Sequence, residues 1–338
     1  MARSVVGGLC SPFRSIAYFF RLFIVEKDIT LNRFWKIFKI CGPVPRQFLH
    51  AAESRESRRS IQTQISAAIQ KSKDIKDALN GVVGDEVVPH RAFVVYPSSE
   101  TRFLDGCHVK AISKGAMNTI IKTLDKRSAD AAFDLYESIR GSSLAASFRC
   151  NMWERKAHGY LPRQGTCSFT IRSLDDASNA RLDLPEGIKY SVFGPTQELS
   201  GKIADCVDAR ESVYLQPISD NFASLDSIIY QPNNPLIGIQ ITNASSHSIK
   251  TKGLKALQSL LSSKNKSLSP LRPTPEKPWI ILFVVPKQME KSFTRQSITG
   301  HANATWSKKT VQYVLGLDER EVFRAQFEDE ESEESENE

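Results

Sequence analysis

The run Trp279–Val285 (WIILFVV) leaves few possible folds for this chain. Continuous apolar residues without alternation are typical of a β-strand that is buried on both faces. Such a strand needs helices packed on each side of its sheet. The second half of the sequence therefore predicts an α/β architecture, with a mixed central sheet flanked by helices.

The elements around this run follow an order that fits such a sheet. Helices are expected over Leu144–Leu161 and over residues 247–261, where leucines follow one helical face. Residues 262–278 are rich in Ser, Pro and Lys and predict a mobile basic loop. Further strands are expected over Cys167–Arg172, Ile188–Phe193, Ser212–Leu215, Ser224–Tyr230, Leu236–Thr242 and Lys309–Leu315.

The first half of the chain is predicted to be mainly helical. Helices are expected over residues 13–41, around Ile61, Ile65 and Ile69, and over residues 113–140, with strands at Ala92–Tyr96 and Val109–Ile112. Gly42-Pro43 ends the first helix, and Gly141-Ser142-Ser143 breaks the pattern again. We therefore expect a helical domain at 1–140, an α/β domain at 141–320 and a disordered acidic tail at 321–338.

Charge is distributed unevenly along the chain. The net charge is +7, but residues 328–338 hold eight acidic residues and no basic one, so residues 1–327 hold 45 basic and 30 acidic residues, a net charge of +15. A body this basic attracts polyanions, and nucleic acid is the first candidate. The acidic tail offers a docking segment for a protein partner, or a partner for the basic body itself.

The cysteines and the apolar runs predict an intracellular protein. Six widely separated cysteines without a CxxC pair exclude a zinc ribbon and favour reduced thiols. No run approaches the roughly 18–20 apolar residues of a membrane span, and no clear signal peptide is present. We expect no membrane association, and a nuclear location fits the positive charge.

A group of polar residues interrupts two of the expected strands. Asp226 lies in one apolar strand, and Gln240 and Thr242 share one face of the next. The turn Gln231–Pro235 makes these strands a hairpin, which brings the three side chains together. Hard oxygen ligands of this kind suit Mg²⁺. Glu154 and His158, at i and i+4 of the preceding helix, add a carboxylate and a base.

On these residues, the second half resembles the restriction-endonuclease-like nuclease domain with the PD-(D/E)XK pattern, in the version found in fungal Crinkler and retrotransposon hot-spot type proteins. The resemblance implies a Mg²⁺-dependent nuclease whose first candidate substrate is DNA, with RNA left open. Glu154, Asp226 and Gln240 then occupy the positions of the metal ligands. The similar segments are Leu144–Leu161 (LAASFRCNMWERKAHGYL), Asn221–Asp226 (NFASLD), Gly238–His247 (GIQITNASSH) and Ile280–Pro286.

Two positions depart from the family pattern. Gln240 is a neutral amide in place of the acidic ligand of the third strand, and Thr242 stands where the family has its lysine. Lys250 or Lys252 could supply the missing cation, with His247 as a second candidate. The site residues expected from the resemblance are therefore Asp226, Gln240, Thr242, Lys250 and His247. Without a replacement for the lysine, the domain would bind nucleic acid or a protein partner without cleaving DNA.

The first half carries a second resemblance. Phe34–Gln47 (FWKIFKICGPVPRQ) looks like the lid that follows the P-loop ATPase module of the Crinkler group, with Arg46 in the place of its sensor arginine. No GxxxxGK(S/T) sequence is present, so autonomous ATP hydrolysis is not expected. The resemblance therefore implies a protein of the Crinkler group whose ATPase module is truncated. The ubiquitin-like header of secreted Crinklers is absent as well.

Overall fold

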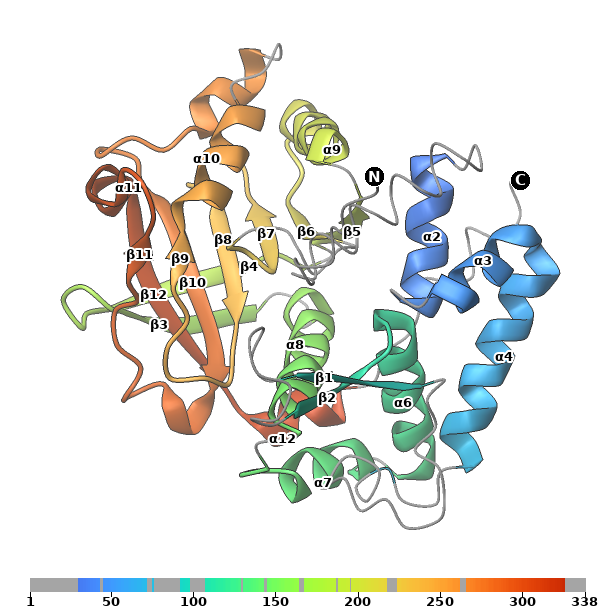
Figure 1. Ribbon diagram of the computed structural model, residues 1–338. Helices are drawn as coiled ribbons and strands as arrows, with labels where there is room; N and C mark the ends of the chain where they lie inside the picture. Colours follow the sequence, from blue (N-terminus) through green and yellow to red (C-terminus); the bar gives the residue numbers. More distant parts are fainter. Residues whose placement is uncertain are drawn as a thin grey trace, which may run out of the picture. The chain divides into compact units, whose positions relative to one another are not determined.

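The computed structural model divides the chain into two compact units, residues 1–152 and 153–338. The division falls within α8 (Ala146–Tyr160), whereas the sequence pattern placed a boundary at Gly141. Figure 1 shows the elements of both units. The structure describes residues 30–42, 45–71, 75, 92–97, 107–128, 130–142, 145–163, 167–186, 188–194, 196–217, 224–261 and 266–325. The acidic segment 328–338 and residues 13–29 of the first expected helix lie outside these ranges.

An eight-stranded mixed sheet forms the centre of the C-terminal unit, in the order β4-β3-β12-β10-β8-β7-β6-β5. The predicted α/β class with a flanked mixed sheet is thereby confirmed. Strand β10 pairs in parallel with both β8 and β12, as its apolar sequence requires. The strands are β3 (Cys167–Ser173), β4 (Asn179–Leu184), β5 (Lys189–Phe193), β6 (Val213–Pro217), β7 (Ser227–Tyr230), β8 (Ile237–Ile241), β10 (Trp279–Pro286) and β12 (Thr310–Leu317).

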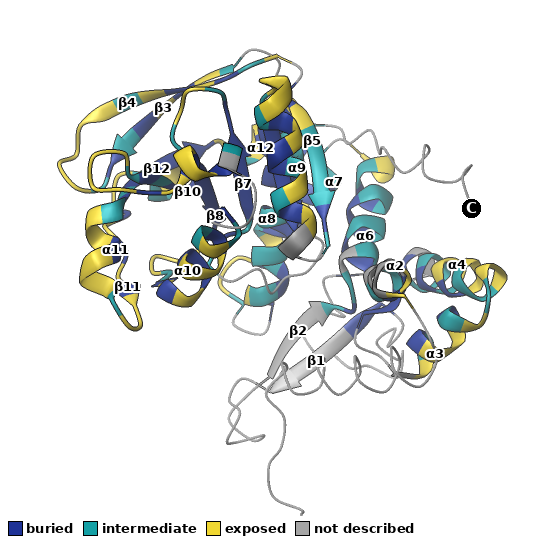
Figure 2. Ribbon diagram, turned by 90° about the horizontal axis from the view of Figure 1, so that it is seen from above, coloured by how far each residue is buried: buried dark blue, intermediate teal, exposed yellow. Residues whose placement is uncertain are grey.

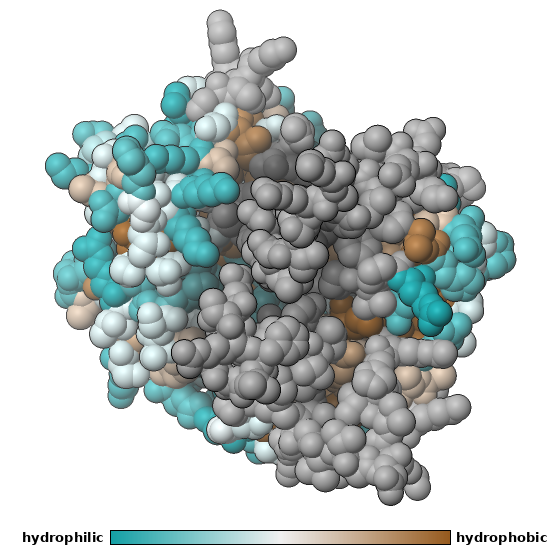
Figure 3. Space-filling view, viewed as in Figure 1, coloured by the Kyte–Doolittle hydropathy of each residue, from teal (hydrophilic) through white to brown (hydrophobic). Residues whose placement is uncertain are grey.

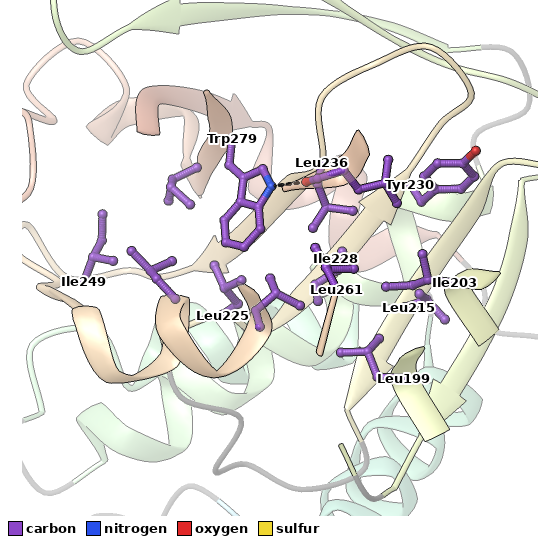
Figure 4. Packing of buried hydrophobic residues seen from close by; sticks show 14 of the residues in the cluster. Leu199, Ile203, Leu215, Leu225, Ile228, Tyr230, Leu236, Ile249, Leu261 and Trp279 are labelled. Carbon is purple, nitrogen blue, oxygen red and sulfur yellow. Dashed lines mark hydrogen bonds between the residues drawn. The ribbon is translucent and has the colours of Figure 1, made fainter. Parts of the chain in front are cut away.

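The two faces of this sheet are covered by different helices. On one face, Leu215, Ile228 and Ile281 share a buried core with α9 (Thr196–Ala209) and α10 (Thr251–Leu260). Figure 4 shows part of this packing, and Figure 2 shows the buried residues on the strands and on the inner sides of these helices. We call it the α10 face. The opposite face contacts the end of α8 and is called the α8 face.

Two expectations for the C-terminal unit were wrong. The helix expected from residue 247 begins at Thr251, because Ile249–Lys250 first pairs as β9 with β11 (Ile298–Thr299). Residues 266–271 of the expected mobile loop form a 3₁₀ helix instead. Its residues Leu268 and Leu271 are buried, and the indole Nε1 of Trp279 donates a 2.7 Å hydrogen bond to the Leu271 carbonyl. Burial of two leucines explains why this segment is ordered.

The N-terminal unit contains five helices and one hairpin among its described residues, before α8 begins. The helix expected over 113–140 is interrupted at Ser128, whose extended backbone ends the first part. Gly42 has a φ of +61°, and a Cβ there would lie 1.9 Å from the Ile112 carbonyl oxygen, so only glycine fits. The elements are α2 (Leu31–Cys41), α3 (Pro45–Glu53), α4 (Arg55–Lys71), β1 (Phe93–Pro97), β2 (Cys107–Ala111), α6 (Lys114–Arg127) and α7 (Ala131–Ser138).

Within the described ranges, no helix is both long enough and apolar enough to cross a bilayer. Arg46 lies exposed in the first turn of α3.

Candidate functional site

Asp226 lies just ahead of β7 and binds the neighbouring strand. Its backbone N–H donates to the Ile239 carbonyl at 2.8 Å, and its carboxylate Oδ2 accepts the Ile241 N–H at 2.7 Å. The Asp226 side chain therefore extends the hydrogen bonding between β7 and β8 by one position ahead of Ser227, the first residue of β7. The hairpin does bring Asp226 to the Gln240–Thr242 segment. One carboxylate oxygen, however, is already used to satisfy a backbone donor.

Gln240 lies on the α10 face of the sheet. It is two residues from Gly238, so both point to the same side. Gly238 pairs with Ile228 of the α10-face core, and the Leu225 side chain fills the space where a Cβ would stand. Gln240 is 1% exposed, and its Oε1 has no hydrogen-bond donor among the described residues. The amide thus lies within a layer of apolar side chains.

Glu154 lies on the α8 face. Its Oε1 is 3.8 Å from Nε2 of His158, and Nδ1 of His158 is 2.7 Å from the Tyr214 hydroxyl. Tyr214 precedes Leu215 in β6, so it points away from the α10 face. Glu154 and Gln240 therefore belong to opposite faces of the sheet.

The opposite faces of Glu154 and Gln240 count against a single Mg²⁺ held by all three predicted ligands. Ligands of one Mg²⁺ must all lie about 2.1 Å from it, which side chains on opposite faces of a packed sheet cannot achieve. The described residues also include no group of three His, Cys, Asp or Glu side chains arranged to hold a metal. The set Glu154, Asp226 and Gln240 stays a prediction, although sequence spacing did not tell which face of the sheet the helix of Glu154 covers.

On the α8 face, a buried chain of hydrogen bonds joins Ser227, Tyr214 and His158. The Ser227 hydroxyl donates to the Tyr214 oxygen at 2.8 Å, and the Tyr214 hydroxyl is then left to donate to Nδ1 of His158. This arrangement leaves the proton of His158 on Nε2, toward Glu154. Burial is the main cause that raises the pKa of Tyr214 well above its usual value, and the Ser227 bond opposes it only in part. Tyr214 is therefore a neutral donor.

Thr242 and His247 each use a hydrogen-bonding group to hold a neighbouring segment of the backbone or a side chain. Thr242 is buried, and its Oγ1 accepts the Ala244 N–H at 3.0 Å, so the side chain closes a turn. His247 is half-buried, and its backbone N–H donates to Oε1 of Gln296 at 2.7 Å. Burial lowers the pKa of His247, with Glu154 opposing the shift and Lys250 adding to it. Burial therefore disfavours the charged form of the ring.

Lys250 and Lys252 belong to a larger basic region that sequence reasoning did not identify. Residues 227–275 contain six Lys or Arg, residues 291–317 contain four, and neither segment contains Asp or Glu. The two segments meet where β9 pairs with β11, and the Gly300 backbone lies against the Thr251 side chain at the start of α10. A count of acidic residues along the sequence would have revealed this region.

Five lysines of these segments, of which four are exposed and Lys309 is half-buried, are together called the basic surface. Lys250, Lys252 and Lys255 lie on β9 and α10, and Lys308 and Lys309 end α11 (Asn303–Lys309). Within the described chain, no carboxylate pairs with the first three or with Lys308. Hydrophilic residues cover this side of the unit in Figure 3, over α11 and β11. Lysines without acidic neighbours leave a positive potential exposed to solvent.

Comparison with known proteins gave no matching family model, no similar curated protein and no similar solved structure.

Proposed function

We propose that the C-terminal unit binds nucleic acid, DNA in the first place, through the basic surface. We further propose that it is a restriction-endonuclease-like domain of the Crinkler type that binds without cleaving. The observation that carries the proposal is the absence of acidic residues from 227–275 and 291–317, beside ten basic ones. Phosphate contacts by Lys and Arg supply most of the affinity of sequence-independent binding.

The side chains around the β7–β8 hairpin support binding rather than cleavage. Glu154 and Gln240 lie on opposite faces, and the Asp226 carboxylate is engaged by the Ile241 N–H. Thr242 carries no positive charge and closes a turn. Among Glu154, Asp226, Gln240 and Thr242 themselves, no side chain is a cation that could stabilise the charge that develops on a phosphate during hydrolysis. A nuclear location and a protein partner for the acidic tail stay predictions.

A gel experiment with a labelled DNA duplex tests this proposal. The full chain is expected to retard the duplex at low salt and to leave it intact with Mg²⁺ or Mn²⁺. The Asp226→Ala variant is expected to retard the duplex equally and to leave it intact as well. In the proposed function, the Asp226 carboxylate binds the Ile241 N–H and takes no part in contacting or cleaving DNA.

Two results would count against the proposal. Failure to retard DNA would remove binding altogether. Metal-dependent cleavage that Asp226→Ala abolishes would show instead that the hairpin forms a working nuclease site.

A further inference from the structure

Every Ser-Pro or Thr-Pro pair in this chain has a basic residue at the same distance. The pairs begin at Ser11, Ser269 and Thr274, and the third residue after each is Arg14, Arg272 and Lys277. Only 45 of the 338 residues are Lys or Arg, so agreement at all three positions is not expected by chance. The first pair lies outside the described residues.

This pattern matches the needs of a proline-directed protein kinase. Proline has no backbone N–H, so a kinase pocket without an acceptor takes proline after the phosphorylated residue in preference to other residues. A basic side chain two residues further along can pair with an anionic group of the kinase.

The second and third pairs lie at the surface of the C-terminal unit. Ser269 and Thr274 are both exposed. Residues 274–277 form a turn in which the Thr274 N–H donates to the Lys277 carbonyl and the Lys277 N–H donates to Oγ1 of Thr274, both at 3.1 Å. All four residues of this turn are exposed.

We propose that Thr274 and Ser269 are phosphorylation sites of a proline-directed kinase, and that their phosphates weaken DNA binding. The second part rests on the proposed function. In the reaction, Oγ1 of Thr274 forms a bond to the γ-phosphorus of ATP while the bond from that phosphorus to the β–γ bridging oxygen breaks. ADP leaves, and the hydroxyl proton goes to the catalytic base of the kinase.

The surroundings of the two sites make Thr274 the faster one. A kinase binds its substrate as an extended segment, so the local structure must open first. Opening the Thr274 turn breaks two hydrogen bonds that water replaces, and the four residues of the turn are already exposed. Opening the 3₁₀ helix around Ser269 transfers Leu268 and Leu271 from the core to water, which keeps the open form rare.

The effect on binding follows from charge. Residues 227–275 carry six basic residues and no acidic ones. Each phosphate adds a charge of about −1.5 to −2 at pH 7. Two phosphates therefore cancel half or more of the positive charge of this segment. Both would lie shortly after α10 in the sequence.

Phosphopeptide mass spectrometry on the intact protein tests the two sites. The full chain is incubated with a cyclin-dependent kinase and MgATP, and phosphate is located over time. Phosphate is expected first on Thr274 and about tenfold more slowly on Ser269. Pro275→Ala and Lys277→Ala are each expected to slow modification of Thr274 at least about tenfold, whereas Ser259→Ala, at an exposed serine without a following proline, leaves it unchanged. Absence of phosphate at both sites, faster modification of Ser269, or indifference to both variants would overturn the assignment.

Fluorescence anisotropy with the same DNA duplex tests the consequence. Phosphorylated protein is expected to bind about fivefold or more weakly than unmodified protein, and the double variant Ser269→Ala/Thr274→Ala to be insensitive to the kinase. Equal binding by both forms would overturn the regulation and leave the proposed function standing. If the unmodified protein does not bind DNA, the proposed function and the regulation both fall, while mass spectrometry alone decides the two sites.

Discussion

The double substitution Lys252→Glu/Lys255→Glu is expected to weaken binding to a DNA duplex by about a hundredfold at low salt. Both lysines are exposed on α10, within a segment that contains no acidic residue. Each reversal removes an attraction to phosphate and introduces a repulsion, and phosphate contacts dominate such affinity. Fluorescence anisotropy with a labelled duplex measures the change.

The control for this experiment is the double substitution Arg55→Glu/Arg59→Glu on α4. It changes the net charge by the same amount at exposed positions of the other unit. We expect it to weaken binding by less than about threefold, because neither arginine belongs to the basic surface. Equal losses in both variants would mean that DNA responds to the total charge of the protein and that the basic surface has no special role.

The substitution Tyr214→Phe is expected to destabilise the protein by about 2–4 kcal/mol. It removes the hydroxyl that joins Ser227 to His158, and both partners are at most 1% exposed. The variant leaves a buried hydroxyl and a buried ring nitrogen without their partner, and water does not reach either one. Urea denaturation followed by circular dichroism measures the free energy of unfolding.

Tyr190→Phe is the matched control for that substitution. The Tyr190 hydroxyl also donates a hydrogen bond, to Oε1 of Gln216 at 2.5 Å, and its ring lies 6.1 Å from that of Tyr214. Tyr190 is half-buried and only Gln216 loses a partner, so we expect a smaller loss, of about 1 kcal/mol. Similar losses of unfolding free energy in the two variants would show that burial of the hydrogen-bond chain on the α8 face adds nothing to the stability of the protein.

Strong local patterns made much of the fold predictable from sequence. Trp279–Val285 is apolar without interruption, and it forms the strand with parallel neighbours on both sides. The Asn- and Pro-rich turn at 231–235 predicted the β7–β8 hairpin, which the structure contains. In these places, local preference and burial act in the same direction, so the sequence pattern is sufficient.

Elements with weak local patterns were missed. The paired segments β9 and β11 are two residues long, too short for any alternation to show. Sequence reasoning also missed β4, α9 and α11, and it took residues 266–271 for a loop because of their Ser, Pro and Lys content. The burial of Leu268 and Leu271 overrides that composition, since it depends on contacts with residues far away in the chain.

The candidate site shows the same division between local and long-range information. Hairpin geometry correctly predicted that Asp226 meets the Gln240–Thr242 segment, because strand pairing and alternation are local properties. Which face α8 covers depends on the packing of the whole unit, so the sequence could not place Glu154 relative to Gln240. The Tyr214 chain escaped notice for the same reason: Ser227, Tyr214 and His158 come from three separate elements.

The salt dependence of DNA binding by the unmodified protein tests the central claim most directly. Binding through the lysines of the basic surface releases counterions from the duplex, so the logarithm of the association constant should fall linearly with the logarithm of the salt concentration, by about 0.9 for each phosphate contacted. With three or more lysines engaged, the account predicts a slope of about −3 or steeper. A slope near zero, or no binding even at low salt, would contradict it.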